Sequence, residues 1–248
     1  MFDPKQSGAT ERLMMVMMQI AISPSPISVQ QLSDQLQIPK SSLYRHLALL
    51  REWNLIMMDP DYHRYTIGPA ALALQHNFST LSHLSGNVER TLVRLQQQTG
   101  EMAAYMVPMG FQAMCVDSIE SLNALRCSFE KGKSQPLIRG ASSKVMLAHM
   151  EIADVNAVLD HFLVTDIAER DRWHNNLEAI RTQGFAISNS EFDSGVSGVS
   201  APVLHHGKLV GAVSIMAPEE RVSRNRKLIV DSVLGAAVAI AHPWRHSR

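Results

Sequence analysis

The short stretch KSSLYR, in the first quarter of the chain, carries side chains well suited to contact DNA. Its two cations and three hydroxyl groups belong to Lys40, Ser41, Ser42, Tyr44 and Arg45. Small hydroxyl side chains beside the free N–H groups of a helix N-terminus favour phosphate oxygens, and arginine is the commonest bidentate partner of guanine. We therefore predict that Lys40 and the serines face the DNA backbone, and that Tyr44 and Arg45 reach base edges or the backbone.

The same stretch continues into a helix with an ordinary apolar face. Leu43, Leu47 and Leu50 are spaced i, i+4 and i+7, which places them on one side of a helix. Most amphipathic helices only cover a core with such a face. The alternative to DNA binding is therefore that the polar residues around it form a solvated surface, and the flanking sequence has to decide between the two.

The flanking residues indicate two short helices joined by a tight turn. Ser28 and Gln31 have the spacing of a capping box, which begins a helix. Pro39 suits the first position of the second helix, where its missing N–H costs nothing. Asn54 tolerates the left-handed conformation that often ends a helix. This order is typical of a helix-turn-helix, whose second helix enters the major groove.

A hairpin is predicted to follow the second helix. Strands over 55–58 and 62–67 flank a turn at 59–61, and Arg64 lies near the turn, where it could reach the DNA backbone or minor groove. Together these elements make 9–68 a winged helix-turn-helix. The stretch holds five basic and five acidic residues, so we expect DNA affinity to depend on geometry and dimerisation more than on bulk charge.

A methionine-rich helix is predicted over 10–22, ahead of the helix-turn-helix. Methionine fills irregular gaps in cores, which favours a packing role over a cofactor role. The apolar residues expected to share its core face are Leu13, Met14, Met17, Met18 and Ala21.

Composition limits the class of protein. The chain has 248 residues, and its formal net charge is zero. Hydrophobic residues make up 46% and charged residues 19%, so the chain has enough apolar material for one large or two modest domains. Its two cysteines build neither a disulfide framework nor a four-cysteine zinc site. The N-terminal residues lack the pattern of a signal peptide. The longest apolar run, 233–241, is far shorter than the about twenty residues of a membrane helix. We expect a soluble, cytoplasmic protein with no membrane partner.

The rest of the chain alternates between helical and strand patterns. Residues 69–79 are predicted to form a helix that connects two domains, and 80–98 a second helix. The predicted strands are 102–107, 112–118, 124–129, 185–188, 199–205 and 209–217. Further helices are predicted over 141–160, as one or two elements, and over 169–183 and 228–241. A strand-rich middle flanked by helices predicts an α+β domain of mixed α/β composition, not a series of βαβ units.

Motifs for catalysis are missing. The sequence has no phosphate-binding GxxxxGK[ST], no HExxH, no CxxC and no dinucleotide-binding GxGxxG. The stretch 195–198 fails the spacing of a nucleophile elbow. His205 and His206 fall in a predicted hairpin turn, where adjacent strand residues point to opposite faces, so joint metal ligation is not expected. The sequence predicts no enzyme activity, no cofactor and no metal site.

The sequence resembles the IclR family of transcriptional regulators over nearly the whole chain. The similar pieces are IPKSSLYRHLALLREWNLI, YTIG, LQQQTGE, PLIRGASSKVMLA and RTQGFAISNSEFDSGVSGVSAPVLHHGKLVGAVSI. The resemblance implies a winged helix-turn-helix over 9–68, a linker helix over 69–79, and an effector-binding and oligomerisation domain over 80–248 with a GAF- or PAS-like antiparallel sheet flanked by helices. It also implies a homodimer or homotetramer that binds double-stranded operator DNA and a small organic, sugar or aromatic acid.

The resemblance also implies a set of effector-binding residues. The loop before the helix at GASSK places Ala141, Ser142 and Ser143 at the effector, because small residues at a helix N-terminus leave room for an anion. A tight helix cap without a ligand is the alternative. The matching strand and loop add Cys127 and Gln135, although Cys127 is better explained as an inert core residue than as a ligand contact.

The chain departs from the family pattern at two places that line the pocket in relatives. Ser188 and Asn189 stand where many members have an acidic pair, which keeps hydrogen-bonding capacity without the charge. Gly198 stands where many have a cysteine, which predicts a larger or differently shaped pocket. No known effector is therefore transferred to this chain.

Two other functions remain open from the sequence. One is a small-metabolite enzyme whose helix-turn-helix only packs against other elements. The other is a protein-interaction module whose winged helix has no DNA partner. The preferred hypothesis is an effector-controlled regulator, either repressor or activator.

Overall fold

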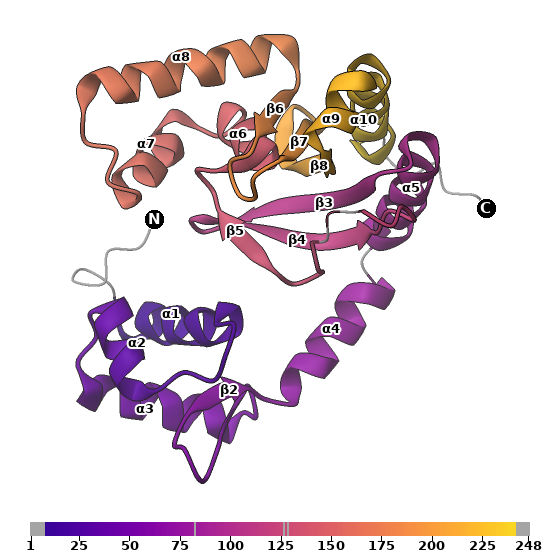
Figure 1. Cartoon of the computed structure of the whole chain (residues 1–248). Coiled ribbons are helices and arrows are strands. Elements are labelled where there is room, and N and C mark those ends of the chain that lie inside the picture. The colour runs from indigo at the N-terminus through magenta and orange to yellow at the C-terminus, as the bar shows by residue number, and fades with distance from the viewer. Residues whose placement is uncertain (1–7, 82, 126, 128, 242–248) are drawn as a thin grey trace. The chain divides into compact units, whose positions relative to one another are not determined.

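The computed structural model describes residues 8–241 except 82, 126 and 128 (Figure 1). The chain divides into two compact units, Met1–Ser82 and His83–Arg248.

The N-terminal unit is a helical domain with a short hairpin, followed by one further helix. Its elements are α1 Ala9–Ile22, α2 Val29–Leu36, α3 Lys40–Glu52, β1 Ile56–Met58, β2 Tyr65–Ile67 and α4 Ala70–Leu81. The predicted capping box begins α2: the Gln31 N–H donates to Ser28 Oγ at 3.2 Å, and the Ser28 N–H donates to Gln31 Oε1 at 3.0 Å. These bonds satisfy two N–H groups that a helix start otherwise leaves without partners.

The turn between α2 and α3 has the tightness of a helix-turn-helix. Gln37 adopts a left-handed conformation with φ of 54°, which ends α2. Pro39 was predicted as the first helical residue, but its ψ of 140° is extended, so it caps α3 and the helix begins at Lys40. Asn54 has φ of 55°, which confirms the left-handed residue predicted beyond the end of α3.

The core of this unit confirms one predicted helix face and corrects another. Leu43, Leu47 and Leu50 are all buried. In α1 the buried residues are Val16 and Ile20. Leu13 and Met17 are half-buried, whereas Met14, Met18 and Ala21 are exposed, so the predicted core face was wrong in part. Apolar residues surround this helix on most sides, and its rotation is therefore set by packing rather than by the pattern.

The hairpin is shorter than predicted. Its strands pair antiparallel, with Ile56 opposite Ile67 and Met58 opposite Tyr65. The Asp59 carboxylate accepts the N–H groups of Asp61 and Tyr62 at 2.9 and 3.0 Å, which closes a turn. This turn keeps residues 59–64 in a loop, so 62–64 lie outside the second strand.

The C-terminal unit is built on one antiparallel sheet of six strands in the order β5-β4-β3-β8-β7-β6. The strands are β3 Met102–Met109, β4 Gln112–Ile119, β5 Ser134–Pro136, β6 Ala186–Asn189, β7 Val196–His205 and β8 Lys208–Pro218. The helices are α5 His83–Thr99, α6 Gly140–Ala148, α7 Ile152–His161, α8 Ile167–Gln183, α9 Glu219–Arg224 and α10 Arg226–Ala241. The mixed α/β class and the antiparallel sheet flanked by helices are thus as predicted.

Different helices cover the two faces of this sheet (Figure 1). Ala103 and Tyr105 of β3 pack in one hydrophobic cluster with α5 and α10. Ala104 and Met106 of the same strand pack in a second cluster with α6, α7 and α8. Successive residues of a strand point to opposite faces, so each long strand contributes to both cores.

Two short elements differ from the sequence predictions. The strand predicted over 124–129 is absent at the described residues of that stretch. The edge of β4 is instead taken by β5 and the residues before it, because the Cys115 N–H donates to the Lys133 carbonyl at 2.8 Å. The short helix α9 was not predicted.

No helix among the described residues combines the length and the apolar character needed to cross a bilayer.

Candidate functional site

The first candidate surface is the solvent-facing side of α3. Lys40, Ser41, Tyr44 and Arg45 are exposed there, and Ser42 is half-buried. Leu43 and the other core leucines fix the opposite side of the helix, so the exposed set is held on a rigid element. The first turn and a half of α3 thus presents hydroxyl and cationic groups to the solvent, the types that contact phosphates and base edges.

Arg64 lies just before β2, and its side chain contacts the loop between α1 and α2. Its Nη1 donates to the Pro26 carbonyl at 3.4 Å, a long hydrogen bond that holds the exposed guanidinium loosely. The sequence did not suggest this contact. Tyr62, in the same loop, is 76% exposed and was not predicted as a candidate for DNA contact.

His46 lies on α3 beside this surface and was also overlooked. Partial burial lowers the pKa of His46, and the positive charges of Arg45 and Arg12 lower it further. The imidazole is therefore neutral near pH 7 and adds no positive charge to this side of α3.

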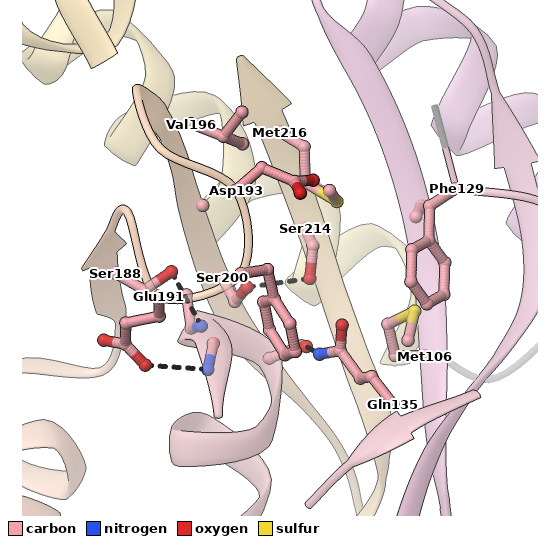
Figure 2. Close-up of a pocket in the computed structure, with 16 residues that line it drawn as sticks. Met106, Phe129, Gln135, Ser188, Glu191, Asp193, Val196, Ser200, Ser214 and Met216 are labelled. Atoms are coloured by element: carbon pink, nitrogen blue, oxygen red, sulfur yellow. Dashed lines mark hydrogen bonds between the residues drawn. The ribbon is translucent and has the colours of Figure 1, made fainter. Parts of the chain in front are cut away.

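The second candidate site is a cavity between the start of α6 and the sheet (Figure 2). Its volume is about 40 Å³, enough for a few water molecules or a small part of a ligand. Strands β3, β7 and β8 form its floor, the loop between β6 and β7 forms a side, and α6 begins at its wall. The wall is partly apolar, through Ala104, Met106, Phe129, Val196 and Met216.

The structure brings five of the predicted effector residues together in this cavity. They are Gln135, Ala141, Ser142, Ser188 and Gly198.

The other three predicted residues lie outside the cavity wall. The Ser143 hydroxyl is buried and donates to the Pro136 carbonyl at 3.2 Å. Asn189 is exposed, and its Oδ1 accepts the Ser197 hydroxyl at 2.7 Å. Cys127 is half-buried, and burial raises the pKa of its thiol, followed by the charge of Glu101.

The N–H groups at the start of α6 already have partners from the β6–β7 loop and its strand. The Ala141 N–H donates to Ser188 Oγ at 3.1 Å, and the Gly140 N–H donates to Glu191 Oε2 at 2.9 Å. The second Glu191 oxygen pairs with the Lys144 ammonium. The negative charge lies where a helix N-terminus favours it.

Gly140 and Gly198 give the cavity its shape. Gly140 has φ of 82°, and a Cβ there would lie 2.7 Å from the Phe192 ring. A Cβ on Gly198 would lie 3.0 Å from Ser188 Oγ. The Ser188 hydroxyl thus lies close to the space that a side chain at position 198 would need, and the larger or differently shaped pocket stays a prediction.

Two pairs of polar side chains complete the wall. Gln135 Nε2 donates to Ser142 Oγ at 3.0 Å, and the hydroxyls of Ser200 and Ser214 lie 2.7 Å apart. The sequence pointed to neither Ser200 nor Ser214, although a hydroxyl inside a buried apolar strand is a signal that could have found them. Glu191 and its loop neighbours carried no such signal, because their place at α6 depends on the fold.

Among the described residues, no three His, Cys, Asp or Glu side chains are grouped so that they could hold a metal ion. His205 and His206 lie at the turn after β7 with ring centroids 4.3 Å apart.

The chain is similar to named regulators over most of its length. It is 26% identical over 239 residues to the HTH-type transcriptional regulator BhcR of Paracoccus denitrificans, covering 92% of this chain and 84% of that protein. It is 26% identical over 232 residues to the HTH-type transcriptional repressor AllR of Klebsiella pneumoniae, covering 90% of this chain and 84% of that protein.

Solved structures give the same picture of the fold. The C-terminal domain of a transcriptional regulator from Vibrio cholerae is 53% identical, with a TM-score of 0.61, over 65% of this chain and 99% of that one. An IclR transcriptional regulator from Silicibacter sp. TM1040 has a TM-score of 0.83 at 20% identity, over 94% of this chain and 95% of that one.

Two family models match adjacent parts of the sequence. The IclR helix-turn-helix domain matches residues 9–60, and the C-terminal domain of bacterial IclR transcriptional regulators matches residues 79–242, more than half of the chain. The proteins of this family are DNA-binding regulators with effector-binding domains, not enzymes. The chain belongs to the IclR family of transcriptional regulators.

Proposed function

We propose that the exposed side of α3 binds operator DNA and that a small molecule in the cavity at α6 controls this binding. The observation that carries the first part is the exposure of Ser41, Tyr44 and Arg45 on a helix whose opposite side is locked in the core. Lys40 and the half-buried Ser42 at the start of α3, and the exposed Arg64 before β2, are assigned to the DNA backbone because they carry cationic or hydroxyl groups. The cell compartment proposed is the cytoplasm, where such a regulator meets chromosomal DNA.

The proposed assembly is a homodimer or homotetramer on a roughly palindromic operator. One recognition helix reads one half-site, and two-fold symmetry then places the half-sites about 34–36 Å apart. The proposed domain division follows the sequence prediction, with 9–68 for DNA, 69–79 as linker and 80–248 for effector binding and oligomerisation. Helix α4, Ala70–Leu81, overlaps the proposed linker and extends two residues beyond it.

The proposed effector site is the cavity, with Gln135, Ala141, Ser142, Ser188 and Gly198 in its wall. An effector that binds one arrangement of the oligomer more tightly than the other shifts the oligomer toward that arrangement and so changes its affinity for DNA, and DNA changes the affinity for the effector by the same factor. Taken alone, the family resemblance predicts an acid as the effector.

Arg45→Ala tests the DNA-binding assignment. We expect operator affinity to fall by about 1–3 kcal/mol, because a side chain that contacts a base or phosphate is removed from a fixed position. Fluorescence anisotropy with DNA from upstream of the chain's own gene and its neighbours measures this loss at moderate salt.

Arg172→Ala is the matched control, because it removes the same charge from an exposed position of the C-terminal unit. Its affinity for the operator should match that of the wild type. Unchanged operator affinity in the Arg45→Ala protein, at a salt concentration where the wild type binds, would show that α3 is not the recognition helix.

A further inference from the structure

The chain's own carboxylate occupies the anion position at the start of α6. Glu191 accepts the Gly140 N–H through one oxygen and pairs with Lys144 through the other. The Ala141 N–H is taken by the Ser188 hydroxyl. A ligand carboxylate that sought these N–H groups would have to displace Glu191 or take a place beside it. Displacement would break the Glu191 contacts with Gly140 and Lys144, and a place beside Glu191 would bring two negative charges together in a partly buried site.

Gln135 contributes a carbonyl acceptor to the cavity wall, beside serine hydroxyls that can donate or accept. Gln135 is 8% exposed, and its Nε2 faces Ser142 Oγ and, at 3.5 Å, the Arg139 carbonyl. A carbonyl only accepts, which fixes the orientation of the Gln135 amide. Its Oε1 has no hydrogen-bond partner among the described residues and points toward the space between Ser214 and Phe129 (Figure 2). An acceptor in this position can bond to an O–H or N–H group of a ligand or of water.

The charged side chains that line the cavity also favour an uncharged hydrogen-bond donor over an anionic ligand. Within the described part of the chain they are Glu191 and Asp193, and no cationic side chain lines it. The nearby Lys144 is already paired with Glu191. The other polar groups of the wall are neutral amide and hydroxyl groups on Gln135 and on serines.

We propose that this cavity takes a small uncharged molecule with an O–H or N–H donor, and that Glu191 is the specificity-determining residue that excludes carboxylates. The donor bonds to Gln135 Oε1, and the neighbouring serine hydroxyls bond to the rest of the molecule. The inference rests on the proposed function of the cavity as the effector site. It replaces the acid expected from the family resemblance with an uncharged ligand.

Acetamide and acetate form a matched pair of probes, because they are nearly equal in shape and differ in charge and in donor capacity. The full chain, labelled with ¹⁵N glycine and alanine, is titrated with each probe while the amide signals of Gly140 and Ala141 are followed. In the wild type we expect acetamide to give saturable shifts. Acetate should bind at least about tenfold more weakly than acetamide.

Two substitutions of Glu191 test its role. Glu191→Gln keeps an acceptor for the Gly140 N–H but removes the charge, and Glu191→Ala empties the position. Acetate affinity should rise by about tenfold in the first and by more in the second, whereas acetamide affinity stays within about twofold. Should the alanine variant fold poorly, the glutamine variant alone decides the result.

Asp193→Asn is the matched control. It removes one negative charge from the same cavity and leaves the Glu191 contact with α6 intact, because Asp193 makes no hydrogen bond to α6 among the described residues. Acetate affinity should therefore change much less than in Glu191→Gln. Equal gains in both variants would show that overall charge, and not the occupied helix start, excludes acids.

Two results would overturn the proposal. One is a wild-type protein that binds acetate as tightly as acetamide, with no change on Glu191→Gln. The other is the absence of saturable acetamide shifts at Gly140 and Ala141. Neither measurement uses DNA. A wild-type protein that fails to bind the operator in a separate anisotropy assay would therefore contradict the proposed function without changing the measured preference between acetamide and acetate.

Discussion

At the scale of single residues, the glycines at the cavity show how closely the backbone constrains the site. Gly140 combines φ of 82° with the Phe192 ring at the position a Cβ would need. Gly235, in the middle of α10, has nothing within 4 Å of its Cβ position. The same residue type is therefore required at one position and only tolerated at the other.

Substitution by alanine should separate these two glycines. Gly140→Ala should lower the free energy of unfolding by about 1–3 kcal/mol, because the left-handed backbone and the Phe192 contact both oppose a Cβ. Gly235→Ala should raise it by about 0.5–1 kcal/mol, because a helical glycine is replaced by a better helix former. Urea unfolding followed by circular dichroism measures both changes, and equal effects would contradict the assigned backbone conformations.

At the scale of elements, a buried ion pair attaches α9 to the start of β3. Arg221 donates to both oxygens of Glu101 at 2.6 and 2.7 Å, and the Glu101 side chain is 5% exposed. The hydrogen bonds with Glu101 are also the main cause of the raised pKa of Arg221. A carboxylate buried this deeply depends on its partner, because water does not replace the lost bonds.

Removal of the arginine should therefore be costly. Arg221→Ala leaves Glu101 buried without its partner and should lower the free energy of unfolding by about 2–4 kcal/mol. The control is Arg224→Ala, which breaks an exposed pair with Glu220 and should cost less than about 1 kcal/mol. Thermal unfolding at pH 7 compares the two, and similar losses would show that the Glu101 pair adds little stability.

Local patterns predicted the elements that local chemistry determines. The capping box at Ser28 and the left-handed Asn54 are of this kind, because the deciding contacts lie within a few residues. The buried side of α1 was predicted wrongly in part, because its own methionines lie on several sides of the helix and packing against other elements determines which side is buried. The place of Glu191 at α6 was missed because a contact between residues 140 and 191 has no local signature.

At the scale of the whole molecule, each unit has its own hydrophobic core. The N-terminal cluster is built from residues of α1, α2, α3 and the hairpin, whereas the two clusters of the C-terminal unit use only residues beyond Ser82. A unit that buries its own core can fold by itself.

We therefore expect a fragment of residues 79–248 to fold alone and to retain the acetamide response at Gly140. A Vibrio cholerae relative of 53% identity has a crystal structure of its C-terminal domain, which supports this expectation. Cooperative thermal unfolding and dispersed amide signals would confirm it. A fragment that binds a hydrophobic dye and melts without a transition would show that the N-terminal unit is needed for folding.

Alternate residues of β3 face the cavity on one side of the sheet and a hydrophobic cluster on the other. Ala104 and Met106 face the cavity, whereas Ala103 and Tyr105 press against the cluster that holds α5. Both sets share one backbone, so a ligand on the cavity side would contact the same strand that supports the cluster on the other face. Helix α5 is the first helix of the C-terminal unit, so the strand that lines the cavity also packs against the part of this unit that is nearest in sequence to the DNA-binding unit.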